Sequence, residues 1–247
     1  MRRVLLVLAC ATVLAACGST GDDGSRRLTV FAAASLGPTF TELAERFERE
    51  HEGVDVVLAL GGSSDLAAQI IEGAPADVFA AADERTMRTV TDAGEAQDPA
   101  VFATNTLQVV TPAGDPERIA SIRDLARPGL KVVLCAPQVP CGAASRTLLD
   151  GAGVAVAPAS EEQSVTDVLG KVISGEADAG LVYVTDVRMA GDAVRGVEVP
   201  ESAATRNRYP IAVLRNADDA GLAGEFVAFV TGVTGRTVLA EAGFEVP

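Results

Sequence analysis

Segments with the pattern of strands and segments with the pattern of helices alternate from residue 28 to the C-terminus, and this alternation limits the fold more than any other feature. Residues 28–31 form the apolar run of a buried strand, whereas residues 36–50 place apolar side chains at helical spacing with charges on the opposite face. The change of period recurs along the chain, with Gly73 and Gly94 at the ends of two helices. The alternation predicts an α/β protein with mostly parallel sheets flanked by helices.

The individual elements follow from the same periodicity. The expected strands are residues 28–31, 54–60, 77–81, 107–111, 131–135, 154–157, 179–184, 197–199 and 211–214. The expected helices are residues 36–50, 65–72, 84–93, 121–126, 142–149, 222–230 and 234–242. A further helix carries Val165, Val168 and Val172, and residues 160–163 (Ser-Glu-Glu-Gln) have the sequence of a capping box that would open it. One large sheet or two lobes would both suit this chain.

The N-terminus has the pattern of a targeting segment. Arg2 and Arg3 form a positive start, residues 4–14 form a short apolar run, and small residues precede Cys17. The pattern resembles a bacterial lipoprotein signal, which implies cleavage before Cys17 and attachment of lipid to its sulfur. A plain secretory signal with an incidental cysteine is the alternative.

We therefore expect residues 1–16 to be a signal peptide and residues 17–27, which are rich in glycine and serine, to be a flexible tether. The apolar run of the signal is too short to span a bilayer, and no later segment approaches 18 consecutive apolar residues. The folded part is expected to be soluble, extracytoplasmic and attached to the cell membrane by its lipid only.

Cysteine usage agrees with this compartment. Cys10 would leave with the signal and Cys17 would carry the lipid, so the mature domain keeps Cys135 and Cys141. We expect this pair to form a disulfide, because an even pair of cysteines in an oxidising environment normally does. Redox chemistry would need the C-x-x-C spacing, which this pair lacks.

The charge balance limits the kinds of partner. The chain has 34 acidic and 20 basic residues and a formal net charge of −14, which becomes −16 when Arg2 and Arg3 leave with the signal. Affinity for nucleic acid depends on cationic contacts with phosphates, so no nucleic-acid partner is expected. The chain has no tryptophan and only two tyrosines, which leaves few stacking platforms for sugars or bases.

The sequence also lacks the residues that common enzymes need. The single histidine, His51, lies at a polar helix end, and no G-x-S-x-G motif is present, which argues against a Ser–His hydrolase. One histidine cannot build a His-rich metal site. We expect no enzymatic activity, no cofactor and no directly coordinated metal.

Small polar residues gather at three expected junctions between a strand and a helix, at residues 33–35, 61–64 and 140–142. In an open α/β sheet such junctions meet at the carboxyl ends of the strands, where ligands bind. Serine hydroxyls beside the free N–H groups of a helix N-terminus would complete an anion site. The alternative is that each serine only caps its helix. Neither common glycine-rich nucleotide motif is present, so nucleotide binding has little support.

Seven motifs together resemble the solute-binding protein family of the molybdate ABC importer, in register from about residue 28 to residue 244. The motifs are VFAAASL (residues 30–36), GSSDL (62–66), GAPADVF (73–79), NTL (105–107), VPCG (139–142), GLVY with Asp186 (180–183) and YPIAV (209–213). The resemblance implies a two-lobed periplasmic-binding fold of type II with molybdate in the cleft between the lobes.

In that family the oxyanion is held by two serine hydroxyls, one tyrosine hydroxyl and backbone N–H groups, without a cationic side chain. Carried onto this sequence, the expected ligand-binding residues are Ser35, Ser63, Cys141, Val165 and Tyr183, with Ser64 as a near alternative to Ser63. Alanine is more usual at the position of Cys141, but a backbone N–H is present with either residue.

Elementary chemistry agrees with a site made of donors. Molybdate at neutral pH is a fully deprotonated dianion, so every contact should donate a hydrogen bond, whereas phosphate keeps a proton and would need an acceptor. Tungstate is almost isosteric with molybdate, so tungstate, or another tetrahedral oxyanion such as sulfate, is the alternative ligand.

The resemblance also implies the division of the chain and its partners. Lobe 1 would comprise residues 28–106 and 216–247, and lobe 2 residues 107–215, with a hinge in the crossing strands near residues 107–111 and 209–213. The protein is expected to be a monomer that delivers molybdate to an ABC transporter permease.

Overall fold

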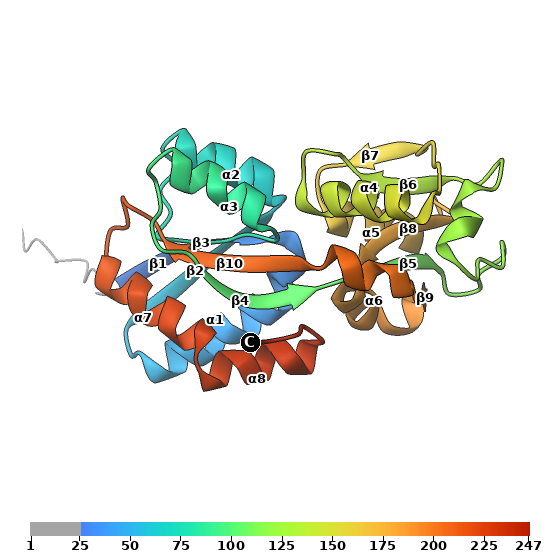
Figure 1. Cartoon of the computed structure of the whole chain (residues 1–247). Helices are drawn as coiled ribbons and strands as arrows, with labels where there is room; N and C mark the ends of the chain where they lie inside the picture. Colours follow the sequence, from blue (N-terminus) through green and yellow to red (C-terminus); the bar gives the residue numbers. More distant parts are fainter. Residues whose placement is uncertain (1–25) are drawn as a thin grey trace, which may run out of the picture.

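The computed structural model describes residues 26–247. The predicted signal peptide, the lipid site Cys17 and nearly all of the predicted tether lie outside the described residues. Within residues 26–247 the chain forms two lobes side by side, each built on a five-stranded sheet with helices on its faces (Figure 1). The two-lobed α/β fold predicted from the sequence is therefore confirmed.

Lobe 1 contains the sheet with the strand order β2-β1-β3-β10-β4. Its strands are β1 (Arg26–Ala33), β2 (Val54–Gly61), β3 (Val78–Ala80), β4 (Ala100–Asn105) and β10 (Asn207–Val213). Strand β1 pairs in parallel with β2 and β3, whereas β10 is antiparallel to both β3 and β4. This sheet is mixed.

Helices cover both faces of this sheet (Figure 1). They are η1 (Ala34–Leu36), α1 (Gly37–Glu50), α2 (Ser63–Ile71), α3 (Glu84–Asp92), α7 (Ala220–Thr231) and α8 (Val233–Ala242). Because side chains of a strand alternate between faces, Leu28 and Val30 join the core on the side of α1 and α7, while Phe31 joins the core under α2 and α3. Burial on both faces explains why the strands read as continuous apolar runs.

Lobe 2 contains the sheet with the order β7-β6-β8-β5-β9. Its strands are β5 (Leu107–Pro112), β6 (Val132–Cys135), β7 (Ser160–Glu162), β8 (Ala179–Tyr183) and β9 (Val194–Val197). Its helices are η2 (Ile122–Ala126), α4 (Pro140–Ala152), α5 (Val165–Ile173), α6 (Val184–Ala190), η3 (Gly191–Ala193) and η4 (Pro200–Thr205). Strand β6 is parallel to β7 and β8, and β5 is antiparallel to β8 and β9.

The prediction of mostly parallel sheets was wrong for the two strands that follow the points where the chain passes from one lobe to the other. The chain passes from lobe 1 to lobe 2 between β4 and β5 and returns between β9 and β10. Strands β5 and β10 enter their sheets without the helical crossover that a parallel connection needs, so both run antiparallel to their neighbours.

The return crossing also lies earlier than the predicted boundary at residue 215. Strand β10 (Asn207–Val213) pairs with β3 and β4 and so belongs to the sheet of lobe 1, not to lobe 2. Its apolar sequence would suit either sheet, and only its pairing partners decide the assignment.

Further predictions of secondary structure differ from the structure between residues 100 and 190. The strand expected at residues 154–157 does not form, and Ser160–Glu162 pairs with β6 instead, so the capping box predicted at residues 160–163 was wrong. The N-cap of α5 is Ser164, whose side chain accepts a hydrogen bond from the Asp167 N–H. Strand β4 and helix α6 were not predicted.

Among the described residues no single helix is long and apolar enough to cross a membrane. Helices α7 and α8 reach that length and composition only together, and the pair is bent by 54° at its break. Their apolar side chains, including Phe226 and Leu239, are buried in the core of lobe 1.

The predicted disulfide between Cys135 and Cys141 is present. It joins the end of β6 to the first turn of α4 and closes a loop with a sequence separation of 6. Both cysteines are buried. The disulfide therefore fixes the loop that carries the predicted backbone donor of Cys141.

We expect replacement of both Cys135 and Cys141 by serine to lower the free energy of unfolding by roughly 2 kcal/mol, the chain-entropy value for so short a loop. Chemical denaturation would measure this loss. Reductant should lower the free energy of unfolding of the wild-type protein to that of the double variant, and it should not change the value for the variant. Equal stability of oxidised and reduced wild type would contradict the prediction.

Candidate functional site

A small cavity lies between the lobes, and both lobes line it. Its volume is about 20 Å³, and its lining residues are Ala33, Ala34, Ser35, Gly61, Gly62, Ser63, Ala82, Val139, Pro140, Cys141, Gln163, Ser164, Val165 and Tyr183. The structure thus brings all five predicted ligand-binding residues to one cavity, although they come from segments far apart in the sequence.

Helix N-termini account for much of this lining. Ser63 is the first residue of α2, Val165 is the first residue of α5, and Cys141 is the second residue of α4. Ser35 lies in η1, directly before α1. The first N–H groups of a helix have no acceptor within the helix and carry the positive end of its dipole, so this arrangement favours an anion.

The three predicted hydroxyl groups are buried and already take part in one hydrogen bond each. The Ala82 N–H donates to Ser63 Oγ at 3.0 Å, and Asn207 Nδ2 donates to Tyr183 Oη at 3.0 Å. Ser35 Oγ lies 3.1 Å from Tyr209 Oη, where either hydroxyl can donate. All three side chains are at most 5% exposed.

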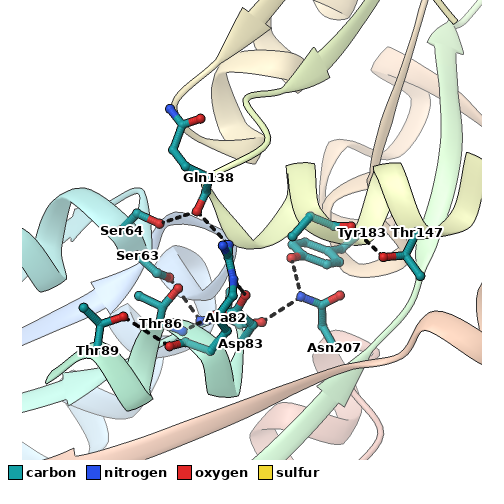
Figure 2. Close-up of polar contacts among 12 residues, drawn as sticks. Ser63, Ser64, Ala82, Asp83, Thr86, Thr89, Gln138, Thr147, Tyr183 and Asn207 are labelled. Carbon is teal, nitrogen blue, oxygen red and sulfur yellow. Dashed lines mark hydrogen bonds and ion pairs between the residues drawn. The ribbon is translucent and has the colours of Figure 1, made fainter. Parts of the chain in front are cut away.

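The lobes are also joined by direct hydrogen bonds between residues that do not line this cavity. The carbonyl oxygen of Gln138 in lobe 2 accepts hydrogen bonds from Ser64 Oγ at 2.9 Å and from Arg85 Nη2 at 2.7 Å, both in lobe 1. Figure 2 shows Ser64 and Gln138 facing each other in this way. The structure is therefore a closed form of the two lobes.

The same contact separates the two serine candidates. The hydroxyl of Ser63 lies in the cavity lining, whereas Ser64 turns to the Gln138 carbonyl and does not line the cavity. The two serines are adjacent at the start of α2, so one of them must point away from the site. Tertiary structure favours Ser63.

None of the side chains that line the cavity carries a formal charge in the part of the chain that the structure describes. Burial raises the pKa of Tyr183 well above its usual value. The neighbouring Tyr209 and the carboxylates of Asp186 and Asp83 raise this pKa further. Burial likewise raises the pKa of Tyr209. Both phenols keep their protons over the physiological range and remain hydrogen-bond donors.

The carboxyl group of Asp186 is fully buried and contacts the backbone of Tyr183. Its Oδ2 accepts a hydrogen bond from the Tyr183 N–H at 2.8 Å, and its Oδ1 has no hydrogen-bond partner among the described residues. Burial raises the pKa of Asp186 from 3.8 to about 7. The carboxyl group holds the N-terminus of α6, and with it the end of β8 that carries Tyr183, in place.

This pKa shift predicts a pH-dependent stability. The folded state keeps the Asp186 proton up to about pH 7, whereas the unfolded chain loses it near pH 3.8. Unfolding therefore releases a proton between these values, and the contribution of Asp186 to stability falls as pH rises through that window. We expect Asp186→Asn to become more stable relative to wild type from pH 4 to pH 7, as measured by urea denaturation. A difference that does not change with pH would contradict this.

Sequence reasoning missed the residues that support the hydroxyls. Asn207, Tyr209 and Ala82 contact the predicted ligand residues but do not stand out by type or spacing. The motif at residues 209–213 contained one of them, but only the pairing of β10 beside β3 and β4 shows their role.

Comparison with known proteins identifies the class. Residues 28–245 match the family of bacterial extracellular solute-binding proteins, and the chain belongs to this family. Proteins of this class bind solutes and do not form an enzyme family.

Individual relatives and solved structures within this class are named for one ligand, molybdate. The molybdate-binding protein ModA of Mycobacterium tuberculosis (strain ATCC 25618 / H37Rv) is 49% identical over 95% of this chain and 93% of its own length. ModA of Escherichia coli (strain K12) is 32% identical over 91% of this chain and 90% of its own length. Among solved structures, the periplasmic molybdate-binding protein of Azotobacter vinelandii is similar with a TM-score of 0.78 and 25% identity, covering 89% of this chain and 99% of that one.

Proposed function

We propose that this protein captures molybdate outside the cytoplasmic membrane and passes it to an ABC transporter permease. The molybdate-binding relatives support the ligand, because their similarity extends over nearly the whole chain. The cavity between the lobes would hold the oxyanion, and the ABC permease would take it up when the lobes open.

The single observation that carries the proposal is the donor character of the cavity. The hydroxyls of Ser35, Ser63 and Tyr183 and the backbone N–H groups of Cys141 and Val165 supply donors, and none of the described side chains of the lining is a carboxylate. A fully deprotonated tetrahedral dianion accepts at every oxygen and suits such a shell. Dipoles at short range outweigh the screened negative charges of the surface, so an acidic protein can bind an anion here.

Calorimetric titration tests the proposal directly. The purified domain should bind molybdate, and tungstate with similar affinity because the two anions are almost isosteric. Sulfate and phosphate should bind more weakly, since sulfate is smaller and phosphate keeps a proton. Molybdate at about 100 times its dissociation constant should stabilise the protein by about 2.7 kcal/mol. Stabilisation by phosphate equal to that by molybdate would overturn the proposal.

The attachment to the membrane belongs to the same proposal. Cleavage before Cys17 would leave this cysteine at the N-terminus, with lipid on its sulfur and a glycine- and serine-rich tether before the folded lobes. Cys17→Ser should move the full-length protein from the membrane fraction to the soluble fraction of expressing cells, or block its maturation. Unchanged membrane association of that variant would refute the lipid assignment.

A further inference from the structure

Asn207 connects the two lobes by hydrogen bonds to two residues that line the cavity. It lies at the start of β10 in lobe 1 and is 7% exposed. Its Nδ2 donates to the Ala82 carbonyl oxygen at 2.9 Å and to Tyr183 Oη, in lobe 2, at 3.0 Å. Figure 2 shows the Asn207 side chain between these two groups.

The orientation of the Asn207 amide follows from chemistry. A backbone carbonyl oxygen can only accept, so the amide atom that faces Ala82 must be the nitrogen and not the oxygen. The second hydrogen of the same nitrogen then points to the Tyr183 hydroxyl. Tyr183 Oη is therefore an acceptor in this contact, and its own single proton is available to a ligand in the cavity or to the neighbouring hydroxyl of Tyr209.

Ser63 is arranged in the same way. The Ala82 N–H, which can only donate, contacts Ser63 Oγ, so the proton of Ser63 is also free for another partner. The backbone of Ala82 thus orients Ser63 directly and Tyr183 through Asn207. Two hydroxyls from opposite lobes thus each accept one hydrogen bond from this framework and keep a proton that can be donated to a ligand in the cavity that both line.

We propose that Asn207 is a specificity-determining positioning residue that keeps the Tyr183 hydroxyl a donor to the bound oxyanion and so excludes oxyanions that keep a proton. This inference rests on the proposed function of the cavity. A protonated dianion such as hydrogen phosphate or hydrogen arsenate must donate its proton to an acceptor. With its acceptor position occupied by Asn207, Tyr183 presents only a proton. Because Asn207 and Tyr183 belong to different lobes, this selection operates in the closed form.

The substitution Asn207→Asp tests the inference most sharply. A carboxylate has nearly the shape of the amide but only accepts, so the Tyr183 proton would turn toward it and leave lone pairs facing the ligand. Asn207→Leu is the second variant, since it removes the donor without adding a charge and frees the Tyr183 hydroxyl to accept. Affinities for molybdate, sulfate, hydrogen phosphate and hydrogen arsenate would be measured at pH 8 by calorimetry.

The ratio of sulfate to hydrogen phosphate affinity is the decisive readout. Both ligands have two negative charges and similar size and differ in the proton, so added charge or a general loss of structure lowers both affinities together. We expect this ratio to fall at least tenfold in both variants, while molybdate affinity falls about tenfold or more. A merely structural role of Asn207 would leave the ratio unchanged, and that result would overturn the inference.

A double-mutant cycle shows whether Asn207 acts through Tyr183. In the Tyr183→Phe background, Asn207→Asp should no longer change the sulfate to phosphate ratio. A change of equal size in both backgrounds would contradict the inference. Failure of the wild type to bind molybdate at all would instead refute the proposed function, so the two failures are distinguishable.

Discussion

Replacement of Gly62 by alanine is expected to lower molybdate affinity by roughly 100-fold while both lobes remain folded. Gly62 is the N-cap of α2 with φ −60° and ψ 128°, a conformation that alanine also adopts. A Cβ atom at this position would lie 2.3 Å from the backbone oxygen of Gln163, which belongs to lobe 2. Steric overlap of this kind destabilises a packed structure by about 1–3 kcal/mol or more. Because the two atoms belong to different lobes, the overlap destabilises only the closed form.

The measurement pairs calorimetry with thermal unfolding. The ligand-free Gly62→Ala protein should unfold near the wild-type temperature, and molybdate should no longer raise that temperature appreciably. Gly170→Ala is the matched control, because this exposed glycine lies within α5 and its Cβ would meet no atom within 4 Å. The control should bind like wild type and gain up to about 1 kcal/mol in stability from helix propensity. Wild-type affinity of Gly62→Ala would mean that binding does not require the closed form described above.

Removal of single hydroxyl groups should have the second largest effect. A hydrogen bond to a charged partner contributes about 1.5–3 kcal/mol, so Ser35→Ala, Ser63→Ala and Tyr183→Phe should each weaken molybdate binding roughly 10- to 100-fold. The buried positions of these side chains in the cavity lining make solvent a poor substitute for the lost donors. Titration calorimetry of the three variants, with circular dichroism to check the fold, would measure the losses.

Ser64→Ala provides the control for this series. Ser64 Oγ donates to the Gln138 carbonyl oxygen of the other lobe, so its loss weakens closure but removes no donor from the lining. A neutral hydrogen bond contributes about 0.5–1.5 kcal/mol, and the affinity should fall at most about tenfold. Unchanged affinity in all three lining variants, or a larger loss in Ser64→Ala than in Ser63→Ala, would show that the assigned site is wrong.

Local sequence patterns predicted most of the architecture because each depends on near neighbours. The apolar spacing of Phe40, Leu43 and Phe47 corresponds to the buried face of α1. Glycines such as Gly73 and Gly94 follow the ends of helices with positive φ, as their sequence positions indicated. The strand expected at residues 154–157 failed because an apolar run alone does not say whether a partner strand lies beside it.

The candidate site was predictable to the extent that it depends on residue type and motif. Ser35, Ser63 and Tyr183 could be named from the sequence because hydroxyls at strand-to-helix junctions and a resemblance to a known family pointed to them. The choice between Ser63 and Ser64 could not be made in this way, since both are serines at the start of the same helix. It depends on which side chain faces Gln138 in the other lobe.

The sequence by itself determined the alternation of strands and helices, the pairing of Cys135 with Cys141 as the two cysteines left in the mature domain, and the hydroxyl chemistry of the cavity. These properties follow from composition and short-range spacing. Only the tertiary structure decided that β10 belongs to lobe 1, which sets Asn207 and Tyr209 beside Tyr183 and Ser35. The physical reason is that strand pairing and hydrogen bonds across a cleft join residues distant in the chain, and the energy of such contacts leaves no periodic trace in the sequence.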